Sequence, residues 1–201
     1  MIKENNIINA SENCNFCKRL YQFRNTLKNQ HYDWHNKPVN SFGSISSELL
    51  ILGLAPGKKG ANRTGRPFTG DGAGKVLFTE LINNKLAKGY YNENGNDNLK
   101  LINCRISNIV KCVPPKNRPI ASEFKNCRNF LINELEKMEN LKLILALGYE
   151  AFKTVLLIYN KNLHDFKFCH NQTFKLKQNL VLVSSFHCSR YNINTKRLTK
   201  E

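Results

Sequence analysis

The sequence lacks the segments that carry a protein into or through a membrane. No run of about 18 consecutive apolar residues occurs, so no membrane-spanning helix is predicted. The N-terminal residues MIKENNIINASENC contain no apolar core of the kind that a secretory signal requires. We therefore expect a cytoplasmic protein.

Acidic residues are scarce. The sequence holds 15 Asp and Glu residues against 31 Lys and Arg residues, which gives a net charge of +16. The excess is spread along the chain, and so large an imbalance repels itself unless an anionic partner screens it. Basic charge also keeps proteins soluble, but we expect nucleic acid as the partner because a basic domain suits phosphate contacts.

A disulfide framework is also not indicated. Seven cysteines are an odd number, and the chain carries no secretory signal that would bring them to an oxidising compartment. Cysteines in that setting are more often ligands of a metal ion or cluster than disulfide partners. We therefore expect free thiols and a metal or cluster site.

Hydrophobic patterning predicts alternating strands and helices within one domain that spans residues 1–201. A chain of 201 residues with 41% hydrophobic residues is long enough for one buried core. The expected strands are 48–54, 101–110, 141–147 and 180–184, and the expected helices are 75–87, 121–139 and 148–159. This alternation predicts a three-layer α/β/α sandwich around a mainly parallel central sheet of about four strands. Ligands bind beyond the carboxyl ends of such strands.

The glycine-rich loop at 55–74 does not match two common nucleotide-binding motifs. A phosphate-binding loop needs glycine where Thr69 stands and a hydroxyl residue where Val76 stands. The dinucleotide-binding pattern G-x-G-x-x-G is not matched by the glycines at 70, 72 and 74. The loop therefore supports neither a nucleoside triphosphate nor a dinucleotide as its ligand.

The same loop resembles the first motif of the uracil-DNA glycosylase superfamily. The motif runs from Gly53-Leu54-Ala55-Pro56-Gly57 through GANRTGRPFTGD at 60–71. Ala55 and Pro56 stand where other families of the superfamily carry a polar side chain, so the chain is similar to the iron–sulfur family called family 5, or type B. Three further segments resemble that family in the same order: CNFCKRL at 14–20, NIVKCVPPKNRP at 108–119 and HCSRYN at 187–192.

This resemblance implies a DNA-repair hydrolase that excises uracil, with hypoxanthine and other deaminated bases as further candidate substrates. Such an enzyme flips the target nucleotide out of the duplex before it cleaves the N-glycosidic bond. The expected partner is DNA containing these bases, and the expected state is a monomer. Two alternatives stay open: a non-catalytic, cluster-containing module that binds damaged DNA, and a zinc-stapled RNA-binding protein.

The resemblance also implies a [4Fe–4S] cluster whose ligands are Cys14, Cys17, Cys112 and Cys127. The spacing of these residues alone does not separate such a cluster from tetrahedral zinc. Its expected role is structural, because it would tie the N-terminal segment to the helix at 121–139. The cysteines left over are Cys104, Cys169 and Cys188, which need no function as small apolar residues.

Positions in the first two motifs imply a base-binding pocket. Phe68 is expected to stack on the flipped base, although a loop phenylalanine is as often part of the core. Asn108 is expected to hydrogen-bond the base, because an amide can both accept from uracil N3 and donate to O4. The backbone segments expected to approach the base closely are those at Gly53, Ala55, Pro56 and Gly57.

Asp71 and His187 complete the expected catalytic set with Asn108. Breaking an N-glycosidic bond builds negative charge on the departing base and positive charge on the sugar. By resemblance, His187 donates near O2 of uracil, and Asp71 supplies an anion near the sugar or the attacking water. Without the resemblance, a lone histidine is usually structural, and a loop aspartate usually belongs to a turn or a helix cap.

The residues expected to contact DNA are Arg63, Ser189, Arg190 and Tyr191. The loop that carries Arg190 and Tyr191 precedes a basic tail, and it is suited to press into the duplex and fill the space that a flipped base leaves. An ordinary solvated run of charge is the alternative. The chain stops at Glu201, where the family usually continues, so we expect the final helix to be short or absent.

Overall fold

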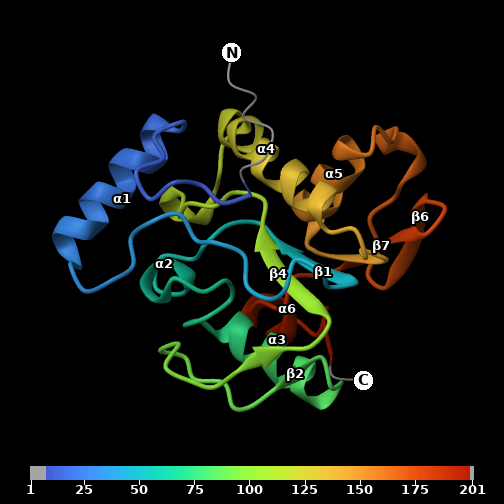
Figure 1. The fold of residues 1–201 in the computed structure, drawn as a ribbon, viewed down its shortest axis with the longest axis horizontal. Coiled ribbons are helices and arrows are strands. Elements are labelled where there is room, and N and C mark those ends of the chain that lie inside the picture. Colours follow the sequence, from blue (N-terminus) through green and yellow to red (C-terminus); the bar gives the residue numbers. More distant parts are fainter. Residues whose placement is uncertain (1–7, 200–201) are drawn as a thin grey trace.

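A five-stranded β-sheet lies at the centre of the structure (Figure 1). The computed structural model of the protein describes residues 8–199. In sheet order, the strands are β4 (Cys104–Asn108), β1 (Leu49–Gly53), β5 (Leu143–Leu147), β7 (Leu180–Ser185) and β6 (Gln172–Lys177). The first four run parallel, and β6 runs antiparallel to β7 at one edge. The predicted mainly parallel sheet is therefore confirmed, with one strand more than expected.

Helices cover both faces of this sheet, as Figure 1 shows. One face packs against α1 (Lys18–Gln30), α4 (Ala121–Lys137) and α5 (Tyr149–Ile158), and the other packs against α3 (Gly72–Asn83). Two short helices, α2 (Ala61–Thr64) and α6 (Arg190–Asn194), lie in the loops after β1 and β7. Side chains of a strand alternate between faces, so Leu50 and Leu52 join the first core and Ile51 joins the second. The three-layer α/β/α architecture is confirmed.

Two features of the sheet differ from the sequence-based expectation. The edge strand β6 was not expected, because only Leu176 of its six residues is buried and the segment has no apolar run. The strand expected at 101–110 is split in two, since the backbone at Asn103 adopts the left-handed conformation (φ 49°). Its first part becomes β3 (Lys100–Leu101), which forms a small antiparallel sheet with β2 (Ala87–Lys88).

Helix α1 was not predicted from the sequence, whereas the helices predicted at 121–139 and 148–159 agree with α4 and α5 within two residues. The helix predicted at 75–87 differs at both ends from α3, which ends four residues earlier, at Asn83. This helix begins at Gly72, three residues before the predicted start, because the Asp71 side chain caps it by accepting the Gly74 N–H at 3.0 Å. Two single-turn 3₁₀ helices, η1 (Pro115–Asn117) and η2 (Leu163–Asp165), complete the described elements. Within residues 8–199, no helix is long and apolar enough to cross a membrane.

Strand register brings three loops to one edge of the sheet. Gly53, the last residue of β1, pairs with Asn108, the last residue of β4. The carboxyl end of β7 lies beside the end of β5, where Ser185 pairs with Leu147. The chain continues from these ends into the three segments that carry the sequence motifs, so the motifs meet at the carboxyl edge.

A buried ionic network ties α4 to β4. The fully buried carboxylate of Glu134 accepts from Arg105 Nε at 2.6 Å and from Ser107 Oγ at 2.8 Å, and it lies 3.2 Å from Lys111 Nζ. Burial alone would raise the pKa of Glu134, but the charges of Lys111 and Arg105 lower it to about 2. The carboxylate is therefore ionised at neutral pH, and the network depends on its charge.

We expect Glu134→Gln to lower the free energy of unfolding by about 3–5 kcal/mol, because it leaves two buried cations without their anion. Urea unfolding at pH 7 measures the loss. The stabilisation by Glu134 should be fully present above its ordinary pKa of 4.5 and should disappear as the pH falls through about 2.

Glu48→Gln is the matched control for this change. Glu48 pairs with Lys142 Nζ at 2.6 Å on the surface, where solvent screens the interaction. Its loss should leave the unfolding free energy close to the wild-type value. Equal effects of the two substitutions would contradict a stabilising role for the buried network.

Candidate active site and cysteine site

A cavity of about 350 Å³ opens at the carboxyl edge of the sheet, where the three motif loops meet. Most of its lining comes from the loop after β1, and the rest comes from the end of β4, the loop after it and the loop after β7. The predicted site residues that line it are Ala55, Pro56, Gly57, Phe68, Asp71, Asn108, His187 and Ser189. The structure thus brings the expected catalytic set into one pocket, which we call the base pocket.

Gly53, the last residue of β1, has no side chain, so two residues that line the base pocket can lie against its backbone. A Cβ atom on Gly53 would lie 2.6 Å from Asn108 Oδ1 and 2.6 Å from Phe68 Cζ. Any side chain at this position would therefore displace both the amide and the ring. The absence of a side chain at Gly53 is what lets Phe68 and Asn108 sit side by side.

Phe68 belongs to the core and to the base pocket at once. Its side chain is buried against the core that α3 forms with the sheet, and it also lines the cavity. The backbone of Phe68 has φ 54°, a left-handed conformation that a bulky residue rarely adopts and that costs about 1–2 kcal/mol. Packing of the ring holds this strained turn in place, so the core reading of Phe68 is confirmed, and its stacking on a base stays a prediction.

His187 stacks on Phe68, with ring centroids 5.6 Å apart and planes inclined by 23°. Burial lowers the pKa of His187 below its ordinary value of 6.5, against the opposing charge of Asp71. The imidazole is therefore neutral at pH 7 and keeps one N–H to donate. Its backbone carbonyl accepts from Asn192 Nδ2 at 2.7 Å, which fixes the loop against α6.

The two carboxylate oxygens of Asp71 lie in different surroundings. Oδ1 caps α3 through the Gly74 N–H, so the helix-cap reading of this residue is confirmed. Oδ2 lies toward the loop after β1, 3.3 Å and 2.6 Å from where a Cβ atom on Gly57 and on Gly60 would stand. One oxygen thus serves the helix, while the other lies beside the pocket wall at Gly57.

The predicted DNA-contacting residues fall into two groups. Ser189 caps α6 and lines the base pocket, the side chain of Arg190 packs over Gly72, and Tyr191 is 62% exposed. Arg63 is on α2 instead, where its guanidinium donates to the carbonyls of Lys59 and Glu93 and to Asn94 Oδ1. These contacts brace neighbouring loops, and DNA binding by all four residues stays a prediction.

Asn117 also lines the base pocket, although the sequence analysis did not single it out. It lies in η1 within the second motif, and its φ of 54° is one that asparagine tolerates better than most residues. Only its position in the run PPKNRP, nine residues after Asn108, could have drawn attention to it. Its proximity to the pocket depends on how the loop folds back.

Comparison with known proteins identifies the family. The model of the uracil DNA glycosylase superfamily matches residues 41–201. The chain belongs to this superfamily. It is 35% identical over 198 residues to the type-5 uracil-DNA glycosylase of Pyrobaculum aerophilum, which covers 96% of this chain and 86% of that protein. It is 34% identical over 195 residues to the type-5 enzyme of Thermus thermophilus, which covers 94% and 88%.

More distant members of the superfamily also match. The type-4 uracil-DNA glycosylase of Sulfurisphaera tokodaii is 27% identical over 194 residues, which cover 94% of this chain and 76% of that protein. This type-4 enzyme is therefore less similar to the chain than the two type-5 enzymes are, in agreement with the resemblance to the type-5 family.

In this superfamily member, four cysteines surround a second, smaller cavity, which we call the cysteine site. They come from the segment just before α1, the segment after β4 and the middle of α4, and they are Cys14, Cys17, Cys112 and Cys127. The remaining cysteines, Cys104, Cys169 and Cys188, do not line it. The structure thus brings together the predicted ligand set and leaves the predicted remainder apart.

Burial and hydrogen bonding set the chemistry of these thiols. Burial raises the pKa of Cys112 from 9.0 to about 12 and that of Cys127 to about 11, so their thiolates need nearby positive charge. The Lys111 N–H donates to Cys127 Sγ at 3.4 Å, and Asn126 Nδ2 donates to Cys17 Sγ at 3.6 Å. Donors to sulfur of this kind are typical around thiolate-bound metal centres.

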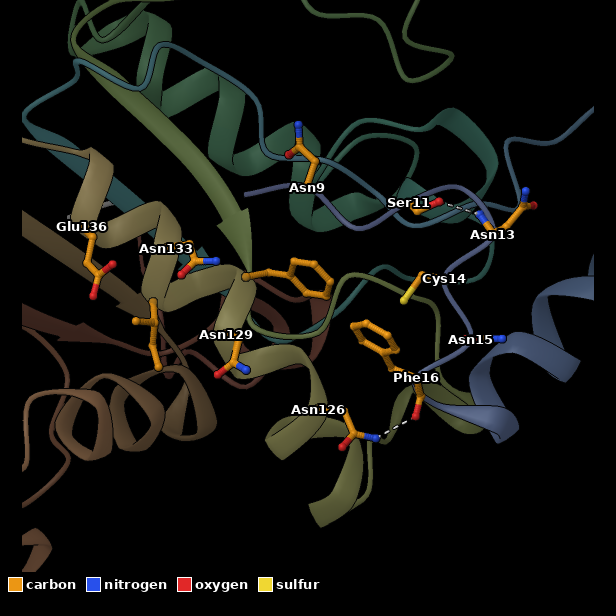
Figure 2. Close-up of a pocket in the computed structure, with 12 residues that line it drawn as sticks. Asn9, Ser11, Asn13, Cys14, Asn15, Phe16, Asn126, Asn129, Asn133 and Glu136 are labelled. Atoms are coloured by element: carbon orange, nitrogen blue, oxygen red, sulfur yellow. Dashed lines mark hydrogen bonds between the residues drawn. The ribbon is translucent and has the colours of Figure 1, made fainter. Parts of the chain in front are cut away.

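A cavity of about 560 Å³ adjoins the cysteine site on its outer side (Figure 2). Its walls are the segment 9–16 and α4, and a hydrogen bond from Asn126 Nδ2 to the Phe16 carbonyl at 2.8 Å joins them. The stacked rings of Phe16 and Phe130 separate the two cavities, since both residues line each of them. None of these lining residues belongs to the base pocket, so the cysteine site is spatially separate from it.

We expect Asp71→Asn to lower the pKa of His187 further, because the charge of Asp71 is the contribution that raises it. NMR titration of the imidazole resonances measures the shift. Asp165→Asn removes the same charge from an exposed turn at η2 and serves as the control, with no change expected at His187. A His187 pKa that moves equally in both variants, or above 6.5 in the wild type, would contradict the described geometry.

Proposed function

We propose that this chain excises uracil from DNA by hydrolysing the N-glycosidic bond of a flipped nucleotide. The observation that carries the proposal is the convergence of Asp71, Asn108 and His187 around Phe68 in one pocket. The names of the type-5 relatives support uracil as the base. Hypoxanthine and other deaminated bases are further candidates for the same pocket.

Base capture follows from the pocket walls. A flipped base is held by stacking and by hydrogen bonds to its edge. Phe68 offers the stacking surface, and the amide of Asn108 beside it can accept from N3–H and donate to O4 of uracil. The pocket volume of about 350 Å³ admits a pyrimidine with its sugar.

Bond cleavage then uses the two remaining polar groups. As the bond between C1′ and N1 breaks, the electron pair moves onto uracil, and negative charge develops at O2, where the neutral imidazole of His187 donates a hydrogen bond. Positive charge develops on the sugar, where the Asp71 carboxylate stabilises it. Water attacks C1′ and gives its proton to Asp71, which leaves an abasic site and the uracil anion. The anion takes a proton from solvent as it leaves, and Asp71 returns its proton to solvent.

The DNA surface is proposed to lie around the mouth of the base pocket. Ser189 is at the pocket and Arg190 and Tyr191 follow it on α6, so this short helix would enter the duplex beside the flipped nucleotide. The net charge of +16 supports binding to the phosphate backbone over a wide area.

The cysteine site is proposed to hold a [4Fe–4S] cluster through its four thiolates. Within residues 8–199, no group of three or more His, Cys, Asp or Glu side chains lies close enough together to hold a metal ion as the side chains stand. Four thiolates suit either a multi-iron cluster or one zinc ion, and the resemblance of the cysteine segments to the iron–sulfur family supports the cluster. When bound, the cluster supplies a cross-link between α1, α4 and the segment after β4.

Asp71→Asn should reduce the single-turnover rate of uracil release by about 10²–10⁴-fold, because it removes the anion near the sugar. Asparagine caps helices as well as aspartate does, so the melting temperature should change little. Quenched-flow cleavage of a uracil-containing oligonucleotide measures the rate.

Two outcomes would contradict this assignment. Near-wild-type cleavage by Asp71→Asn would remove the carboxylate from the mechanism. Tight binding to uracil-containing DNA with no release of base by the wild-type protein would favour a non-catalytic binding module. Asp165→Asn, with its full activity expected, controls for the loss of one negative charge.

Cys127→Ala should abolish the broad absorbance near ~400 nm that thiolate-bound iron–sulfur centres show, together with most of the bound iron and acid-labile sulfide. Cys104→Ala is the matched control, because Cys104 is equally buried but lies outside the cysteine site. It should keep the iron and sulfide of the wild type. One zinc per chain without sulfide in the wild-type protein would overturn the cluster.

A further inference from the structure

Arg24 places a buried guanidinium beside the cysteine site. It lies on α1 one turn after Leu20 and Tyr21, which line the cavity of that site, and it is only 3% exposed. Nη2 donates to the Cys14 carbonyl at 2.7 Å, and Nη1 donates to the Glu12 carbonyl at 3.1 Å. The guanidinium is therefore fixed against the loop that carries the first cysteine.

The third nitrogen of this group lacks an acceptor. Nε of Arg24 is buried and makes no hydrogen bond within the described part of the chain. Both bonds that the guanidinium does make go to carbonyls, so no carboxylate among residues 8–199 neutralises its charge. The Tyr21 ring lies 5.7 Å from the guanidinium carbon but supplies no anion. A buried, charged donor without an acceptor is costly, which points to an anionic group that the protein atoms do not provide.

The proposed cluster with its four thiolates at the cysteine site would be such an anion. Four thiolates around a dicationic cluster core give a net charge of about −2. The positive charge of Arg24 acts on Cys112, and that of Lys111 acts on Cys127. Lys111 and Arg105 share the single carboxylate of Glu134, so that network has one positive charge in excess. The unpaired guanidinium of Arg24 is a second buried excess positive charge. The two buried excess charges match the charge of the centre.

We propose that Arg24 is an outer-shell counter-ion of the cluster, whose Nε–H donates to a sulfur atom of the centre and whose charge raises the reduction potential. This inference rests on the proposed [4Fe–4S] cluster. Arg24 also keeps Cys14 in place at the edge of the outer cavity, where Figure 2 shows this cysteine beside Phe16. Arg24 is thus a positioning residue for the cofactor.

The test compares Arg24→Met and Arg24→Lys with Arg19→Met in the iron-loaded protein. Arg19 lies on the same helix and binds Glu123 of α4 at 2.7 Å, so its charge is already paired. Redox titration followed by visible and electron paramagnetic resonance spectra measures the potential. The rate of iron loss to a ferrous chelator measures how firmly the cluster is held.

Arg24→Met should shift the reduction potential to more negative values, so that at a fixed applied potential the ratio of reduced to oxidised cluster falls by about tenfold or more. It should also release iron faster. Arg24→Lys should recover part of the potential, because it keeps the charge but not the planar donor set. Arg19→Met should lower the melting temperature and shift the potential less than Arg24→Met does, because the Arg19 side chain is 37% exposed and screened by solvent, although its charge also acts on Cys17.

Several results would overturn the role of Arg24. The role is wrong if Arg24→Met and the wild type have the same reduction potential and the same rate of iron loss. Faster iron loss with an unchanged potential would mean that Arg24 only holds the loop at Cys14 in place and is no counter-ion. A wild-type protein that holds zinc and no sulfide would instead defeat the cluster proposal itself, whatever the variants do.

Discussion

The buried carboxylate of Glu134 holds the segment on which both sites depend. It accepts from Ser107 Oγ and faces Lys111 Nζ, which donates to the same hydroxyl at 2.6 Å. Ser107 directly precedes Asn108 in the base pocket, and Lys111 directly precedes Cys112 in the cysteine site. Because a buried anion between two cations tolerates little displacement, α4 fixes the amide and the thiol in one rigid unit.

The base pocket is built at the cost of local strain. The left-handed backbone at Phe68 and the bare backbone at Gly53 both serve to bring an aromatic ring against the end of β1. Strain of this kind persists only where surrounding packing enforces it, and here the ring is embedded in the core beneath α3. The aromatic surface that lines the base pocket therefore belongs to a core side chain, which is rigid before any ligand arrives.

Much of this organisation could be predicted from the sequence, because it follows from local patterns. The buried strands at Leu49–Gly53 and Leu143–Leu147 are apolar runs, and resemblance to the glycosylase motifs placed Asp71, Asn108 and His187 in one site. The edge strand β6 could not be predicted, since only Phe174 and Leu176 of its six residues pack against the core, which is too few apolar positions to define a strand pattern.

The residues that sequence reasoning missed depend on tertiary position. Asn117 reaches the pocket only because the loop after β4 turns back, and Arg24 is one of many basic residues until burial sets it apart. The dual position of Asp71, with one oxygen on the helix and one at the pocket, likewise requires the start of α3 at Gly72. Propensity and motif matching carry no information about such distances.

The antiparallel edge strand β6 also affects how copies of the protein meet. An open edge strand presents unpaired backbone groups that invite pairing with another chain, which is a common start of aggregation. β6 carries Lys175 and Lys177, and Lys177 Nζ lies 5.1 Å from the centre of the Tyr159 ring. Two such edges would bring like charges together, so these lysines oppose the edge-to-edge pairing of two copies. The same protection would hold if many copies were concentrated on one nucleic acid.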